Sequence, residues 1–135
     1  MSKGPDSMYK MASPVDIANK FKNNLVKFID ELIEMFPEET QFVTFRLMVK
    51  DQIPIGMIMD HFVNNVLPVK DSVKKRDDRI FTDSNVLSMG LDSDDANLFR
   101  RIWVSSKLDK DDRAVIWKWI DAFITMADQY KSLTQ

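Results

Sequence analysis

Few residues of this chain could support catalysis or bind a metal, and none stands in a known catalytic pattern. His61 is the only histidine, and cysteine is absent. A zinc site would therefore need His61 together with carboxylates, yet no HExxH or similar spacing surrounds it. A nucleophile activated by His61 would need a serine or threonine brought to it by the fold. We expect His61 to be a helix-surface or helix-packing side chain.

Two acidic clusters, 92–95 and 109–112, have the composition of calcium ligands. An EF-hand loop also needs a glycine at its sixth position and a glutamate at its twelfth. Counted from Asp109, those positions hold Ala114 and Ile120, and the first cluster fails in the same way. We expect both clusters to be helix N-caps.

Glycine occurs only at positions 4, 56 and 90, so a glycine-rich phosphate-binding loop cannot form. A carboxylate pair for glycoside hydrolysis stays open, although nothing among the 21 acidic residues singles out a pair. We therefore predict a protein that is not an enzyme, with no catalytic residue, no cofactor and no metal ion.

The basic residues are the most serious candidates for ligand binding. Five cations lie in the stretch 68–79 against three acids, a local excess of +2 in a chain of net charge −2. A surface that follows nucleic-acid phosphates usually shows a larger bias. Ion pairs along a solvated helix, such as Lys74 with Asp77, are the simpler explanation. If the chain binds nucleic acid, the candidate phosphate contacts are Lys70, Lys74, Lys75, Arg76, Arg79, Arg100 and Arg101.

Large apolar side chains are the candidates for a protein interface. Trp117 and Trp119 lie about 160° apart on a helix that turns about 100° per residue, so one neighbouring face can hardly bury both. Either a different helix covers each, or one of them faces a partner. We predict that Trp119→Ala costs roughly 3–5 kcal/mol in the core, whereas Trp117→Ala costs less and weakens association. The candidate partner interface comprises Trp117, Trp103, Met57 and Met59.

Prolines divide the chain into the helices that must position these residues. Pro14, Pro37, Pro54 and Pro68 each stand at a predicted helix start. Apolar residues at steps of three and four then indicate helices rather than strands. We predict helices over 13–36, 37–50, 54–66, 68–80, 93–104 and 109–131. The connection 81–92 is apolar enough that we expect it to lie against the bundle.

The stretch 109–131 organises this prediction. Its polar positions past the first turn form one narrow strip, and the rest of its circumference is apolar. Such a helix belongs at the centre of a bundle, or between its own domain and a partner. We predict an all-α fold, an irregular bundle of about six helices with the C-terminal helix central. Residues 1–12 form a flexible tail, and 13–135 form a single helical domain.

Composition narrows the class of protein. The chain is 44% hydrophobic and 30% charged, which is typical of a soluble globular protein. No apolar run approaches the 18 or so residues of a membrane span. The N-terminal residues lack the apolar core of a signal peptide, so we expect neither secretion nor membrane binding.

A resemblance to known proteins is carried by four stretches: KFIDELI (27–33), FPEE (36–39), KKRDDRIF (74–81) and LDKDDRAVIWKWIDAF (108–123). In this order the chain resembles small proteins of unassigned function from large double-stranded DNA viruses of algae and protists. The likeness covers nearly everything after residue 14. It implies a viral origin and a location inside the infected host cell or in the virion. None of the stretches is a catalytic motif, so the resemblance implies no activity.

These observations together favour a non-enzymatic protein–protein interaction module. Its setting would be a large DNA virus particle, where the chain would be a minor structural, capsid or assembly component. The partners would be virion proteins or a second copy of the chain. The alternative is a nucleic-acid-binding accessory factor that acts through a local basic helix face.

Overall fold

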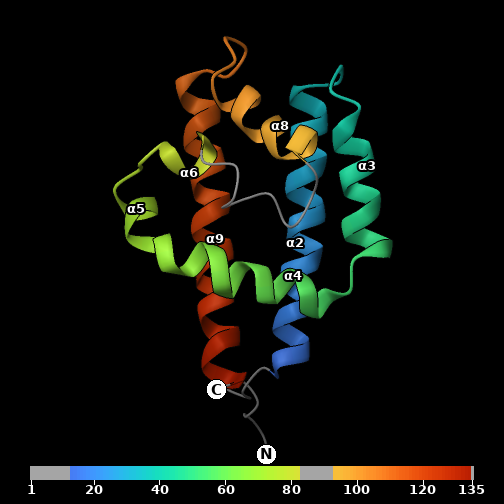
Figure 1. Ribbon diagram of the computed structural model, residues 1–135, viewed down its shortest axis with the longest axis vertical. Coiled ribbons are helices and arrows are strands. Elements are labelled where there is room, and N and C mark those ends of the chain that lie inside the picture. The colour runs from blue at the N-terminus through green and yellow to red at the C-terminus, as the bar shows by residue number, and fades with distance from the viewer. Residues whose placement is uncertain (1–12, 83–92, 135) are drawn as a thin grey trace, which may run out of the picture.

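The computed structural model describes residues 13–82 and 93–134 and shows an all-α bundle (Figure 1). Two long helices, α2 (Pro14–Met35) and α9 (Lys110–Thr134), pack side by side and run in opposite directions. The predicted all-α bundle is confirmed. Among the described helices, none has the length and hydrophobicity that crossing a membrane requires.

Both long helices begin with reciprocal side-chain caps. At α2, the Asp16 N–H donates to Ser13 Oγ (3.1 Å) and the Ser13 N–H donates to Asp16 Oδ2 (3.3 Å). At α9, the Asp112 N–H donates to Asp109 Oδ1 (2.8 Å) and the Asp109 N–H donates to Asp112 Oδ2 (3.2 Å). These bonds satisfy backbone donors that the first helical turn leaves free. The helix starts predicted at these caps, and the capping role of the second acidic cluster, are confirmed.

The chain between the long helices consists of shorter segments. α3 (Gln41–Leu47) continues into a π-helical turn (Met48–Gln52), and α4 (Ile55–His61) continues into another (Phe62–Val66). A 3₁₀ turn (Leu67–Val69), α5 (Lys70–Lys74) and α6 (Arg79–Thr82) follow. The second helix was predicted to begin at Pro37 but begins at Gln41. Residues 37 and 38 instead form a turn, in which the Glu39 N–H donates to the Phe36 carbonyl at 2.9 Å.

The helix predicted over 68–80 is broken after Lys74. Arg76 has a φ of 55°, a left-handed conformation that glycine usually supplies at this position. The Arg76 N–H donates to the Val73 carbonyl and the Asp77 N–H to the Ser72 carbonyl, both at 2.9 Å. This pair of bonds is the Schellman ending of a helix. The prediction of one continuous helix here is therefore wrong.

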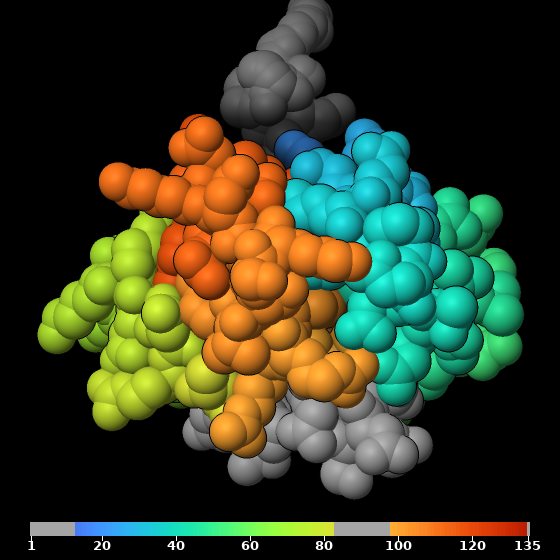
Figure 2. Space-filling model, turned by 90° about the horizontal axis from the view of Figure 1, so that it is seen from above, coloured from blue at the N-terminus to red at the C-terminus, as the bar shows by residue number. Residues whose placement is uncertain are grey.

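The helix predicted over 93–104 is present as α8 (Ser93–Trp103). Seen from above, α8 and the start of α9 lie between the side formed by α2 and α3 and the side formed by α5 and α6 (Figure 2). The segment predicted as a flexible tail, 1–12, lies outside the described residues. Of the connection predicted over 81–92, residues 81 and 82 belong to α6, and 83–92 lie outside the described residues.

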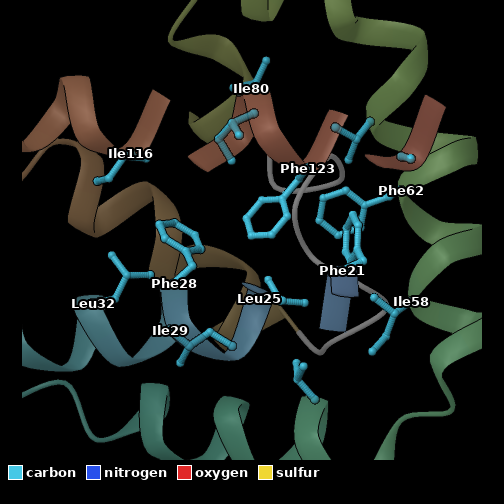
Figure 3. Packing of buried hydrophobic residues seen from close by; sticks show 14 of the residues in the cluster. Phe21, Leu25, Phe28, Ile29, Leu32, Ile58, Phe62, Ile80, Ile116 and Phe123 are labelled. Carbon is cyan, nitrogen blue, oxygen red and sulfur yellow. The ribbon is translucent and has the colours of Figure 1, made fainter. Parts of the chain in front are cut away.

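The buried apolar side chains form one continuous core around α9. Phe123 of α9 meets Phe21 of α2 and Phe62 of the second π-helical turn, with ring centroids 5.1 and 6.0 Å away (Figure 3). The rings of Phe21 and Phe62 themselves lie 4.7 Å apart, edge to face. α9 also packs against α5 and the 3₁₀ turn, so its predicted central place is confirmed.

Candidate functional site

Three of the four residues predicted to form a partner interface are buried inside the chain. The exposed fraction is 4% for Trp103, 7% for Trp117 and 0% for Met59, whereas Met57 is 62% exposed. A side chain already covered by its own chain offers no surface to a partner. The interface prediction is therefore corrected for Trp103, Trp117 and Met59, and only Met57 stays available.

Trp117 is covered by an aromatic cluster drawn from three helices. Phe81 of α6 stacks on Trp103 of α8, with centroids 3.9 Å apart and planes 14° apart. Trp117 of α9 meets both rings edge-on, at 5.0 and 5.4 Å. Trp119, on the other side of α9, is only partly buried and packs on Phe28 and Phe123 at 5.6 and 5.9 Å. A different neighbour thus covers each tryptophan, and the ranking that placed Trp119 deeper is wrong.

Arg76 closes the aromatic cluster from outside. Its guanidinium carbon lies 5.2 Å from the centre of the Trp117 ring, a cation–π distance. Nη1 and Nη2 donate to the two carboxylate oxygens of Asp121, both at 2.8 Å, and Nη1 also donates to the Val73 carbonyl at 3.2 Å. The hydrogen bonds that Arg76 donates to Asp121 raise the pKa of Arg76. The guanidinium is therefore held by three groups on two helices, the Trp117 ring, the Asp121 carboxylate and the Val73 carbonyl.

The Arg76–Asp121 pair forms part of an open groove between α5 and α9. The groove has a volume of about 360 Å³ and is lined by Lys70, Val73, Lys74, Arg76, Asp121, Ile124 and Thr125. We call it the α5–α9 groove. Three of the seven predicted phosphate contacts, Lys70, Lys74 and Arg76, thus come together. Asp121 and Thr125 were not predicted as site residues, although both lie in the polar strip of α9 that the sequence shows.

The other predicted phosphate contacts lie apart from the groove. Arg79 forms an ion pair with Asp77 at 2.6 Å, and this pair replaces the predicted pair of Lys74 with Asp77. The hydrogen bonds from Arg79 lower the pKa of Asp77 to about 2. Arg101 Nη2 donates to Gln41 Oε1 at 2.9 Å and lies 3.4 Å from Glu39 Oε2. Lys75 and Arg100 are exposed outside the groove lining.

α3 carries a different kind of surface. Its inner side buries Phe42 and Phe45, whose rings meet Phe99 of α8 at 6.2 and 5.9 Å. Val43 and Leu47 are 56% and 48% exposed and stand one helical turn apart. We call these two side chains the α3 outer surface. The sequence carried a signal for it, because Val43 and Leu47 lie off the apolar period set by Phe42, Phe45 and Val49.

Comparison with known proteins assigns no family. No family model, curated protein or solved structure matches this chain. The resemblance to viral proteins therefore stays a prediction.

In the part of the chain that the structure describes, the remaining polar residues do not come together as a further candidate site. In residues 13–82 and 98–134, no polar or charged side chain is buried. No three acidic or histidine side chains of the described residues come together as a metal site would need. His61 lies beside Asn65, whose Nδ2 is 3.3 Å from His61 Nδ1 and donates to the His61 carbonyl at 3.1 Å. The candidates are thus the α3 outer surface and the α5–α9 groove.

Proposed function

We propose that this chain is a non-enzymatic protein–protein interaction module that binds its partner through the α3 outer surface. The observation that carries the proposal is the exposure of Val43 and Leu47 on a helix whose opposite side is already packed on the core. A single exposed apolar residue is ordinary. Two on adjacent turns form a short apolar strip, which an interface would cover.

The surroundings of the strip support this proposal. Arg46, three residues after Val43, forms an ion pair with Asp30 of α2 at 2.6 Å, and both side chains are partly exposed. Thr44 and Lys50 on the same segment are also exposed. An apolar centre with a polar, hydrogen-bonding rim is the usual composition of a protein–protein interface.

The proposed setting is the particle of a large DNA virus, or its assembly in the infected cell. It is supported by the sequence resemblance alone. In that setting the chain is a minor structural component, and its partner is a virion protein or a second copy of the chain.

Cross-linking mass spectrometry on purified particles and light scattering on the purified chain test the proposal together. We expect cross-links to the partner through Lys50, one turn from Leu47, rather than through Lys118 on α9. We expect Val43→Asp/Leu47→Asp to abolish association, because the charges would have to be desolvated in the interface. Both positions are exposed, so the stability of the variant should change by less than about 0.5 kcal/mol per site.

The matched control is Val15→Asp/Val104→Asp, two positions that are 67% and 65% exposed and lie outside α3. The control should associate as the parent chain does. A chain that stays monomeric and forms no cross-link in particles or native extract would contradict the proposal. Equal loss of association in both variants would remove the assignment to α3.

The alternative, a nucleic-acid-binding accessory factor, keeps one favourable observation, the convergence of Lys70, Lys74 and Arg76 on one groove. It is weakened because Arg76, Arg79 and Arg101 each bind a carboxylate. This alternative predicts duplex binding whose affinity falls steeply between low and moderate salt.

A further inference from the structure

We propose that the α5–α9 groove binds a single phosphate group, as carried by inorganic phosphate or by a small phosphorylated molecule. This inference is independent of the proposed interaction through α3. It rests on the charges of the groove, on the way Arg76 is held, and on the separation of the other cations.

The charges of the groove match a phosphate dianion. Lys70 and Lys74 stand one turn apart on α5, and neither is ion-paired with another described residue. With Arg76 and Asp121, the lining carries three positive charges and one negative charge, an excess of +2. A phosphate monoester carries about −1.5 to −2 at neutral pH. Lysine acts as a strong point charge toward phosphate.

Arg76 is positioned before any ligand arrives. Its backbone is fixed in the left-handed conformation by the Schellman hydrogen bonds that end α5. The bidentate hydrogen bonds that Arg76 donates to Asp121, together with the ring of Trp117, fix the guanidinium plane in the lining of the groove. Asp121 therefore both neutralises part of the charge and orients the arginine. A preorganised cation loses less conformational entropy when an anion binds.

The geometry favours one phosphate over a nucleic-acid backbone. A protein that follows a duplex contacts several phosphates in succession. Here Arg79 and Arg101 bind carboxylates away from the groove, so the cations form a cluster rather than a track. The groove volume of about 360 Å³ falls at the lower end of the roughly 300–1,000 Å³ typical of small-molecule sites.

Chemical-shift titration of the ¹⁵N-labelled chain with inorganic phosphate tests this inference, with chloride at equal ionic strength as the reference. We expect saturable shifts at the backbone amides of Val73, Arg76 and Thr125. Lys70→Gln/Lys74→Gln should weaken phosphate binding by about a hundredfold, because two charge-assisted hydrogen bonds are lost and each is worth about tenfold or more. The matched control, Lys20→Gln/Lys27→Gln on α2, removes two exposed lysines elsewhere and should leave the affinity unchanged.

Three results would overturn the inference. The first is an absence of saturation by phosphate at millimolar concentrations. The second is an equal loss of affinity in the control variant, which would indicate a general charge effect. The third is a short DNA duplex that binds the groove with a steep salt dependence while inorganic phosphate does not, which would assign the groove to nucleic acid. A ribose phosphate that binds more tightly than inorganic phosphate would support the inference and identify the ligand as an organic phosphate.

Discussion

The two long helices and the segment 41–82 between them are built by different means. α2 and α9 run unbroken for 22 and 25 residues, and each begins with a reciprocal cap. The segment 41–82 changes helix type repeatedly, with two π-helical turns, a 3₁₀ turn and a left-handed Arg76. In the long helices, local sequence signals and tertiary packing agree. In the segment, the break after α5 is accompanied by a tertiary contact, the hydrogen bonds from Arg76 to Asp121 of α9.

Both candidate surfaces, the α3 outer surface and the α5–α9 groove, draw most of their residues from the irregular segment 41–82. Val43 and Leu47 belong to its first helix, and Lys70, Lys74 and Arg76 belong to its last part. Within the described chain, α2 and α9 thus act mainly as the scaffold, and the irregular segment presents the groups that could bind a ligand or partner. α9 contributes Asp121 and Thr125 to the groove from its polar strip.

The largest expected effect separates the two tryptophans of α9. Trp117→Ala should lower the free energy of unfolding by roughly 3–5 kcal/mol, since it leaves a cavity in the aromatic cluster and removes the ring on which the Arg76 guanidinium packs. Trp119 is only partly buried, so Trp119→Ala should cost about half as much. Urea denaturation of both variants measures the difference. A larger loss of unfolding free energy in Trp119→Ala than in Trp117→Ala would mean that the structure of the segment 41–82 does not depend on Trp117.

Sequence analysis predicted the parts of the fold that rest on local chemistry. Ser13 and Asp109 mark helix starts because their partners lie three residues away. The break after Lys74 could not be predicted, because Arg76 is held by Asp121, 45 residues further along the chain. Helix geometry predicted that Trp117 and Trp119 lie on nearly opposite sides of α9. Which of these two sides is covered more fully depends on where α6 and α8 pack.

The same reasoning explains what was predicted of the groove. Its cations were recognised as candidates because they cluster in sequence within α5 and just after it. Their grouping with Asp121 and Thr125, and the separation of Arg79 and Arg101, depend on which helices lie opposite one another. For the α3 outer surface, Val43 and Leu47 lie off the apolar period of their helix, but how far each side chain is exposed depends on which helices pack beside α3.

The next largest effect concerns the backbone at Arg76. Arg76→Ala should cost about 1–3 kcal/mol through loss of the hydrogen bonds and the cation–π contact, since the strain of a Cβ in the left-handed region is common to arginine and alanine. Arg76→Gly loses the same contacts but should be more stable than Arg76→Ala by about 1 kcal/mol, since glycine adopts positive φ without strain. Thermal and urea denaturation compare the two variants. Equal stabilities would show that the left-handed conformation stores no strain.

A smaller effect compares the capped and uncapped helix starts. Asp109→Ala should destabilise the protein by about 1 kcal/mol, because the Asp112 N–H loses its side-chain acceptor. Thr40 precedes α3 without a side-chain cap bond, so Thr40→Ala should change the stability by less than about 0.5 kcal/mol. Equal losses of stability from Asp109→Ala and Thr40→Ala would contradict the view that side-chain caps fix the starts of the long helices but not the start of α3.

The smallest effect is expected at the link between α5 and α6, where Asp77 accepts hydrogen bonds from the Arg79 backbone and guanidinium. These bonds lower the pKa of Asp77 from 3.8 to about 2. A depressed folded-state pKa contributes stability above the unfolded value, so this contribution should disappear as the pH falls from about 4 toward 2.

Carboxyl ¹³C shifts followed against pH would report the midpoint for Asp77 directly. In Arg79→Gln the midpoint should rise toward the ordinary aspartate value of about 3.9, and added salt should produce part of the same rise because the pair is near the surface. A midpoint that stays near 2 in Arg79→Gln would show that the backbone N–H of residue 79 alone holds the carboxylate. The link would then resemble the self-contained caps of the long helices rather than the side-chain contacts that shape the rest of the segment.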